Sequence, residues 1–326
     1  MPASDIGLSL PLTRLNPWYP GQMGVPGGWT ETGLRTHPTG TVFYVDPNHA
    51  LANDGQDGTD PNEPMATIDA AIGKCQDHRG DVIIVGANSA WTYANTAGGY
   101  ATAVVESVTM DVAGVRLIGV TPGTLGVTWN PPAADDMLIT VTAIDCIIEG
   151  FCFEGLGGCD GIFSLWDGTD NFGDSLTIRH CYFDGDIDTA IQLEESWYTN
   201  IHNCYFENCD DYGIYTDPLG SGAAYCHVFG NRFIDVGTSA MECDQMDDSV
   251  IAGNYFYNGT AEGGGASPDA FINTSGGSGG NLVVHNIMSS LLGAGNGRYD
   301  DTCSADANDA WIHNYLQDGV TVLPPA

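Results

Sequence analysis

Basic residues, long apolar runs and paired cysteine motifs are scarce in this sequence. Lysine and arginine together number 8 against 42 acidic residues, which gives a formal net charge of −34. Such a charge repels phosphate backbones and anionic lipid headgroups, so we expect neither nucleic acid nor a membrane surface among the partners. No apolar run reaches the roughly 18 residues that a membrane-spanning helix needs.

The opening stretch also lacks the basic and apolar regions of a secretory signal, and prolines at 11, 17 and 20 interrupt it. We therefore expect synthesis in a host cytoplasm, whatever the final location. The 10 cysteines include no C-x-x-C pair. In a reducing compartment this pattern favours buried thiols over disulfides or zinc ligands.

A six-residue block of the form apolar-x-x-(Cys/Asn)-x-(Phe/apolar) recurs along the chain. The copies are IEGFCF, IRHCYF, IHNCYF, VFGNRF, IAGNYF, VVHNIM and WIHNYL, which start at 148, 178, 201, 228, 251, 283 and 311. The starts are 23 to 32 residues apart. Short β-rich blocks repeated at this spacing are typical of a solenoid, whose units bury their apolar faces only against each other. The sequence therefore predicts an all-β fold of stacked coils, each rising by roughly 4.8 Å.

Two block positions should form columns that run along the solenoid. The fourth position predicts a column of Phe151, Cys181, Cys204, Asn231, Asn254, Asn286 and Asn314. The sixth predicts a column of Phe153, Phe183, Phe206, Phe233, Phe256, Met288 and Leu316. Stacked rings and amide hydrogen bonds passed from coil to coil would explain the repetition.

The segment before the repeats, TVFYVDPNHALANDGQDGTDPNEPMATIDAAIGKC (41–75), contains a YVD strand, an NDG loop and an ATI..AI helix. A GDVIIV strand follows at 80–85. With these features the chain resembles the right-handed parallel β-helices of the pectate-lyase-like superfamily, as found in bacteriophage and bacterial virion or surface proteins. The apolar stripe Ile68, Ala71, Ile72 and Cys75 predicts a helix that caps the open end of the solenoid.

The resemblance implies a right-handed parallel β-helix at 80–326, preceded by the strand, loop and capping helix at 40–79. Residues 1–39 are rich in proline and predict an extended arm. Trp18, Tyr19 and Trp29 lie along it and are candidates for binding a partner. The expected partners are further copies of the chain, as a homotrimer, and a larger protein assembly such as a capsid.

A second strand in each coil offers candidate catalytic residues. Alignment of AIQLE, GIYTD and AMECD places Glu194, Asp217 and Asp244 in one outward column. This column could be a glycosidase pair, an acid with a raised pKa, a Ca²⁺ site or a solvated acidic face. The aromatic candidates for binding a surface glycan nearby are Trp166, Trp197, Tyr198 and Tyr215.

Two further groups of residues contain side chains that can bind metal ions, and only the first is a candidate metal site. In NDGQDGTD, Asp54, Asp57 and Asp60 suit Ca²⁺, although turn formation explains them equally well. No cofactor is required by the sequence, and Ca²⁺ is the one we consider possible. His180, His202, His285 and His313 are expected to occupy block turns as stacked polar residues rather than as metal ligands.

The sequence favours a bacteriophage virion structural protein, such as a capsid decoration, head fibre or spike, attached through its N-terminal arm. One alternative is a polysaccharide-degrading enzyme, such as a spike depolymerase, glycoside hydrolase or lyase. Another is a subunit of a non-viral surface layer or filament. The lysine and arginine positions that β-helix pectinases use for catalysis are absent from this pattern, which favours the structural role over an enzyme. Each reading places the mature protein in a virion or on an extracellular surface.

Overall fold

The computed structural model describes residues 40–86, 104–120, 127–134, 136–155, 157–165, 173–216, 222–243, 245–258, 270–274, 279–290, 304–305 and 308–316. The chain divides into two units, 1–35 and 36–326, and all described residues belong to the second. The predicted arm, with Trp18, Tyr19 and Trp29, lies outside the described residues. Among the residues described, no helix is long and apolar enough to cross a membrane.

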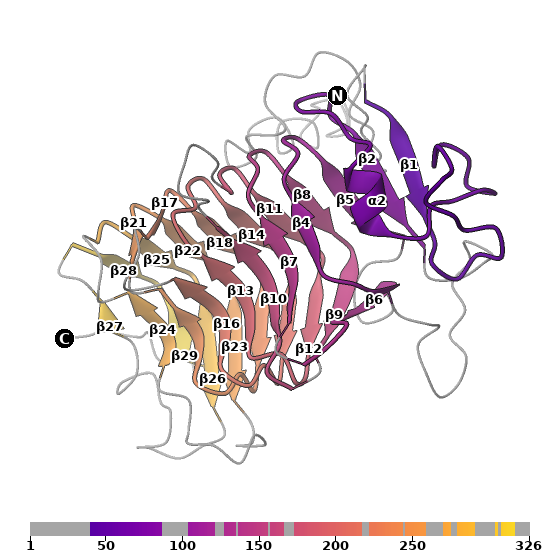
Figure 1. Cartoon of the computed structure of the whole chain (residues 1–326). Coiled ribbons are helices and arrows are strands. Elements are labelled where there is room, and N and C mark those ends of the chain that lie inside the picture. The colour runs from indigo at the N-terminus through magenta and orange to yellow at the C-terminus, as the bar shows by residue number, and fades with distance from the viewer. Residues whose placement is uncertain are drawn as a thin grey trace, which may run out of the picture. The chain divides into compact units, whose positions relative to one another are not determined.

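Unit 36–326 is a parallel β-solenoid whose coils build three long parallel sheets (Figure 1). The first sheet contains β1 (Val42–Val45), β2 (Val82–Val85), β5 (Arg116–Gly119), β8 (Ile147–Glu149), β11 (Thr177–Arg179), β14 (Asn200–His202), β18 (His227–Phe229), β22 (Val250–Ala252), β25 (Leu282–Val284) and β28 (Ala310–Ile312). Because β1 pairs with β2 in parallel, this sheet already begins in the segment that precedes the repeats.

From β2 to β27, each strand of the first sheet is followed by one strand of the second sheet and one of the third. The second contains β3 (Val104–Val105), β6 (Val127–Asn130), β9 (Phe151–Glu154), β12 (Tyr182–Asp184), β15 (Tyr205–Glu207), β19 (Arg232–Ile234), β23 (Tyr255–Asn258), β26 (Ile287–Ser290) and β29 (Tyr315–Leu316). The third contains β4 (Val108–Met110), β7 (Met137–Val141), β10 (Asp160–Ser164), β13 (Thr189–Leu193), β16 (Tyr212–Thr216), β20 (Ser239–Glu242), β24 (Ala270–Thr274) and β27 (Ser304–Ala305). A small two-stranded sheet, β17 (Ala223–Ala224) with β21 (Met246–Asp247), forms part of one corner.

The predicted phenylalanine column is confirmed inside the second sheet. Strand register pairs Phe153, Phe183, Phe206, Phe233, Phe256, Met288 and Leu316 in that order. From Phe153 to Phe256 the ring centroids are 4.5 to 5.0 Å apart and the rings are stacked. This spacing follows from the distance between neighbouring strands, so stacking requires the same residue type in each coil.

The predicted asparagine column is a hydrogen-bonded ladder at the corner between the first and second sheets. The Nδ2 atom of Asn254 donates to Oδ1 of Asn286 at 3.0 Å and to the carbonyl oxygen of Val228 at 2.9 Å. Asn231 donates to Asn254, and Asn286 to Asn314, in the same way. In the earlier coils Cys204 takes this position, and its thiol lies 3.7 Å from the carbonyl oxygen of Ile178.

The block turns explain why the third position is Gly, Asn or His. The residues at this position all have positive φ, between 51° and 82°: Gly150, His180, Asn203, Gly230, Gly253, His285 and His313. Glycine adopts this left-handed conformation without strain, and Asn and His do so more readily than most residues. The expectation that His202 lies in a turn is wrong, because it is the last residue of strand β14.

The helix predicted before the repeats is a short one, α2 (Ile68–Ile72). Ile68, Ala71 and Ile72 are buried as expected, and Thr67 caps the N-terminus. Carboxylate oxygens of Glu106 also accept hydrogen bonds from the Ile68 and Asp69 N–H groups. The helix packs on β1, β2 and β4. That it caps the end of the solenoid stays a prediction.

All nine cysteines within the described ranges are free thiols, and eight of them are buried. Burial raises the pKa of Cys146 and of Cys226 to about 12, so both remain protonated at neutral pH. The predicted role of these residues as buried thiols is therefore confirmed in the part of the chain that the structure describes.

Candidate functional site

The outer face of the third sheet has the register that the sequence predicts. Gln192 pairs with Tyr215, and Tyr215 with Glu242, while Ile191, Ile214 and Met241 are buried. Glu194 follows β13, and its N–H donates to the carbonyl oxygen of Ser164 at 2.9 Å. The other two candidate catalytic residues, Asp217 and Asp244, lie outside the described residues.

The three aspartates of the loop before α2 stabilise its turns. Oδ1 of Asp54 accepts from the N–H groups of Ala66 and Thr67. Oδ1 of Asp57 accepts from the N–H of Thr59, and that of Asp60 from the N–H of Asn62. Among the residues that can be described, no group of three or more His, Cys, Asp or Glu side chains is arranged to hold a metal ion.

The aromatic candidates separate into two places. Trp166 lies outside the described residues. Tyr215 projects from the third sheet, where it stacks on Tyr212 with ring centroids 4.8 Å apart. Trp197 and Tyr198 instead lie at the corner between β13 and β14, where the sequence pattern had not indicated a separate surface.

At this corner Trp197 and Tyr198 are joined by Tyr225, and the three form an exposed aromatic platform. The side chains are 48%, 48% and 42% exposed. The two tyrosine rings stack with centroids 5.2 Å apart at 14°, and Trp197 forms a β-bridge with Ala224. The sequence analysis did not name Tyr225, although it precedes its block at 228 by three residues just as Tyr198 precedes the block at 201.

The backbone of the platform is strained. Tyr198 has a φ of 60° and Tyr225 a φ of 56°. A bulky residue at positive φ is an outlier that costs about 1–2 kcal/mol. The surrounding structure holds the conformation: the N–H of Tyr198 donates to the carbonyl oxygen of Ala224, and that of Trp197 to Oδ1 of Asp174 at 2.7 Å. Strain of this kind on exposed aromatic residues is common at binding sites.

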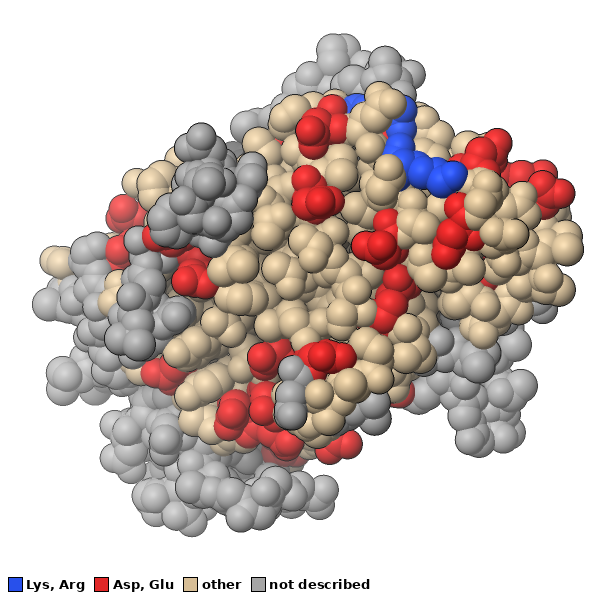
Figure 2. All heavy atoms as spheres, viewed as in Figure 1, with Lys and Arg blue, Asp and Glu red and all other residues tan. Residues whose placement is uncertain are grey.

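A second feature, the acidic column, lies on the outer face of the second sheet. It consists of Glu154, Asp184 and Glu207, which pair directly on strands β9, β12 and β15. The Tyr182 hydroxyl donates to Oε2 of Glu207, and the rings of Tyr182 and Tyr205 stack 5.1 Å apart. On the face that Figure 2 shows, acidic side chains gather at several places, and the basic side chains visible there lie together in one small area near the place of α2 in Figure 1.

Burial and mutual repulsion make the acidic column easier to protonate. Burial raises the pKa of Glu154, and the charge of Asp184 raises it further. The pKa of Asp184 is raised by burial and by the charge of Glu207. Each of these acids follows the block's sixth-position Phe, so the pattern FE, FD, FE was visible in the sequence. The alignment of AIQLE, GIYTD and AMECD did not include it, because those segments form strands of the third sheet.

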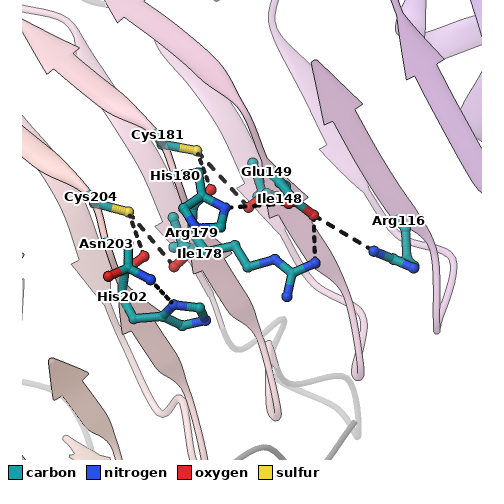
Figure 3. Close-up of polar contacts among 10 residues, drawn as sticks. All are labelled: Arg116, Ile148, Glu149, Ile178, Arg179, His180, Cys181, His202, Asn203 and Cys204. Atoms are coloured by element: carbon teal, nitrogen blue, oxygen red, sulfur yellow. Dashed lines mark hydrogen bonds and ion pairs between the residues drawn. The ribbon is translucent and has the colours of Figure 1, made fainter. Parts of the chain in front are cut away.

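A third feature, the ion-pair cluster, lies on the outer face of the first sheet (Figure 3). Nη2 of Arg179 lies 2.6 Å and Nη2 of Arg116 lies 3.6 Å from Oε2 of Glu149. Nδ1 of His180 lies 3.4 Å from Oε1 of the same carboxylate. Burial alone would raise the pKa of Glu149, but His180 and the two guanidinium groups outweigh it and hold the pKa at about 2.

Comparison with known proteins identifies the class of fold. Residues 141–295 match the family model described as a right handed beta helix region. This part of the chain is therefore a right-handed parallel β-helix, as the sequence predicted, and the described solenoid extends the same coils in both directions. No curated protein matches the chain.

Solved structures with similar folds come from proteins of several kinds. They include a pectin methylesterase from Aspergillus niger (14% identity, 88% of this chain and 89% of that chain, TM-score 0.48). The surface protein and adhesin PfbA of Streptococcus pneumoniae is another (11% identity, 74% and 79%, TM-score 0.40). A third is ORF18 of Geobacillus virus E2 (14% identity, 84% and 62%, TM-score 0.42). Such distant similarity assigns no activity to this chain.

Proposed function

We propose that the protein is a structural component of a bacteriophage virion, or of another extracellular assembly, that binds a surface glycan on the aromatic platform. The observation that supports glycan binding is the group of three exposed aromatic residues at this corner, in which Tyr198 and Tyr225 stack on each other at positive φ and Trp197 is their exposed neighbour. Flat aromatic faces with polar edges suit sugar rings, which present both apolar C–H faces and hydroxyl groups.

Charge favours a sugar over a nucleic acid as the stacking partner. Aromatic platforms for single-stranded nucleic acid lie in positively charged grooves. Here Asp174 contacts Trp197, the carbonyl oxygen of Asp247 accepts the Tyr225 N–H, and the chain carries a net charge of −34. Carboxylate and carbonyl oxygens accept hydrogen bonds from sugar hydroxyls but repel phosphate.

The test is binding of host-surface polysaccharides to the full chain, measured by calorimetry. Trp197→Ala and Tyr225→Ala should each weaken binding about threefold to tenfold, as expected for the loss of one aromatic contact. Tyr215→Ala is the matched control, since it removes a stacked tyrosine from the outer face of the third sheet. Equal loss in all three variants, or binding that none of them changes, would remove the platform as the glycan site.

The assembly role depends on the N-terminal arm and is tested separately. The resemblance of residues 41–75 to the lead-in segments of β-helix virion proteins supports it. Deletion of residues 1–38 should leave the solenoid folded and soluble but abolish incorporation into the assembly. Light scattering should give the mass of a trimer for the full chain. Loss of folding on deletion would show that residues 1–38 belong to the core.

A second candidate function, hydrolysis of a polysaccharide, is favoured by the acidic column. Asp184 and Glu207 lie on neighbouring strands, about 4.8 Å apart at the backbone, which suits the carboxyl spacing of a retaining glycosidase. Asp184, with its raised pKa, would donate a proton to the leaving group. Glu207, oriented by the Tyr182 hydroxyl, would attack the anomeric carbon.

Stereochemistry and substitution together test this candidate. If Asp184 and Glu207 are the pair, NMR of the first product should show retention of configuration. Glu154 and Glu207 are two strands apart, about 9.6 Å, and would instead give inversion. Glu207→Gln should abolish turnover, whereas Glu194→Gln, on the third sheet, should not. If no reducing ends are released from host polysaccharide, the hydrolase candidate is rejected and only the binding role remains.

A further inference from the structure

The corner that carries the aromatic platform is built from two register columns that run along the solenoid. One column passes through Asp174, Trp197, Ala224 and Asp247, and the other passes through Ser175, Tyr198, Tyr225 and Asp248. Three of the four residues that flank the platform in these columns are aspartates, whereas acidic residues make up 42 of the 326 residues in the chain. Neither column contains a lysine or arginine in these coils. The platform therefore lies between negative charges at its own corner.

Two of these aspartates stabilise the backbone of the corner, and the third does not. Oδ1 of Asp174 accepts a hydrogen bond from the Trp197 N–H at 2.7 Å, and Oδ1 of Asp247 accepts one from the Gly279 N–H at 3.0 Å. Asp248 is exposed, and within the described ranges of the chain its carboxylate has no hydrogen-bond or ion-pair partner. Its φ of 47° suits an aspartate, but an asparagine would adopt it equally well. The fold therefore makes no use of the charge at this position.

The stacking geometry leaves one face of each tyrosine ring of the platform uncovered by the other. The rings of Tyr198 and Tyr225 stack with centroids 5.2 Å apart at 14°. Because the coils stack along the solenoid axis, the second face of Tyr225 is turned toward the coil of Asp248, about 4.8 Å away at the backbone. Oδ1 of Asp248 lies over Gly280 in the coil beyond, where a Cβ atom would come within 2.5 Å of it. A group bound on this face would contact the ring on one side and approach a carboxylate on the other.

A protonated amine has the chemistry that such a place favours. The face of a tyrosine ring attracts a cation through the ring quadrupole. A carboxylate one coil away adds charge-assisted hydrogen bonds from the N–H groups of the amine. An anionic sugar would instead be repelled by the three aspartates that flank the platform. The corner therefore favours a cationic sugar over a neutral one, and a neutral sugar over an anionic one.

We propose that the platform recognises a glycan that bears a protonated amino group, with the amine held between the face of Tyr225 and the carboxylate of Asp248. This inference rests on the proposed glycan-binding function and adds the class of sugar, an amino sugar that is not acetylated. The net charge of −34 attracts any cation, but physiological salt screens charges beyond about 8 Å, so selectivity depends on this local arrangement. A lysine side chain would offer the same amine but no sugar ring for Trp197 to contact.

Glycans of equal length that differ in charge test the proposal. The probes are pentamers of glucosamine, of N-acetylglucosamine and of galacturonate, titrated calorimetrically into the full chain at physiological salt. Where its amines are protonated, the glucosamine pentamer should bind about threefold to tenfold more tightly than the acetylated one, as expected for one exposed cation–π contact and one surface ion pair. The galacturonate pentamer should bind most weakly. The preference for glucosamine should disappear at a pH where its amines are neutral.

Matched variants separate this site from a general attraction to an acidic surface. Asp248→Asn should weaken binding of the glucosamine pentamer by about threefold and leave binding of the acetylated pentamer unchanged. Glu63→Gln removes the same charge from an exposed position in the loop between β1 and β2 and should change either affinity by less than about twofold. If Asp248→Asn does not fold, the pH dependence of binding to the unmodified chain still decides.

The outcomes distinguish this inference from the proposed function on which it rests. If Trp197→Ala weakens binding of both pentamers but the chain does not prefer glucosamine, the platform binds glycans and the inference about the amine is wrong. Equal effects of Asp248→Asn and Glu63→Gln would also overturn it, because the preference would then reflect the overall charge. If neither pentamer binds, or if Trp197→Ala changes neither affinity, both the inference and the glycan-binding function are rejected.

Discussion

The inner and outer faces of the second sheet differ in how strictly neighbouring coils must carry the same residue type. Facing inward, strands β9, β12, β15, β19 and β23 carry Phe153, Phe183, Phe206, Phe233 and Phe256. Facing outward, one residue earlier on the same strands, they carry Cys152, Tyr182, Tyr205, Arg232 and Tyr255. Inside, each ring must fit the ring of the next coil. Outside, neighbouring coils are free to differ, so chemically distinct sites can form there.

The largest expected effect comes from breaking the inner column. Phe206→Ala should lower the free energy of unfolding by about 3–5 kcal/mol, because it leaves a cavity between two stacked rings. Tyr205→Ala, the outward neighbour, should cost only about 0.5–1.5 kcal/mol through loss of its stacking on Tyr182. Denaturant unfolding of both variants gives the two values. Equal losses would mean that the two sides of the strand are not distinct.

The asparagine ladder should be the next most sensitive feature. Asn254→Ala would leave the Asn231 N–H and the Val228 carbonyl oxygen without their buried partner, which should cost about 2–3 kcal/mol. Asn254→Cys should cost less, because a thiol occupies this position in the coil of Cys204 and reaches a carbonyl oxygen there. The same unfolding measurement applies. A cysteine variant no more stable than the alanine variant would contradict this account of the ladder.

On the outer face of the first sheet, His202 should make the free energy of unfolding depend on pH. His202 has a folded pKa of about 3, below that of a free histidine, so the unfolded chain takes up a proton first as the pH falls. Its stabilising contribution is therefore complete above about pH 6.5 and decreases toward pH 3. When the pH is lowered from 8 to 5, the free energy of unfolding of the unmodified chain should fall by about 2 kcal/mol more than that of the His202→Phe variant.

Phenylalanine is the suitable replacement because it keeps the ring stack with Phe229, whose centroid lies 4.7 Å from that of His202. Comparison of the two chains cancels the opposing effect of acids such as Glu154 and Asp184, whose raised pKa values favour folding as the pH falls. If the free energy of unfolding changes with pH in the same way in the unmodified chain and in His202→Phe, then His202 takes up a proton equally in the folded and unfolded states.

The inner columns could be predicted from the sequence because stacking imposes one residue type at one spacing. The same logic found the register of Gln192, Tyr215 and Glu242. It could not find the ion-pair cluster, in which Arg116 reaches Glu149 diagonally from a different register position. Nor did it find the platform, although Tyr198 and Tyr225 each precede their block by three residues, because the aligned columns began at the first block position.

The smallest expected effect on stability concerns the platform, where glycan binding should weaken while the free energy of unfolding stays nearly constant. Tyr198→Gly relieves a positive φ of 60° but removes the stack on Tyr225 and adds backbone freedom to the unfolded chain. These terms nearly cancel, so the free energy of unfolding should stay within about 1 kcal/mol of the original. Glycan affinity should nevertheless fall by about threefold to tenfold. Asn203→Gly, at a φ of 55° in the turn that follows β14, is the control for the backbone effect and should leave affinity unchanged. If Tyr198→Gly unfolds the corner, its aromatic ring is a structural support; if it binds glycan normally, the strain at Tyr198 does not serve recognition.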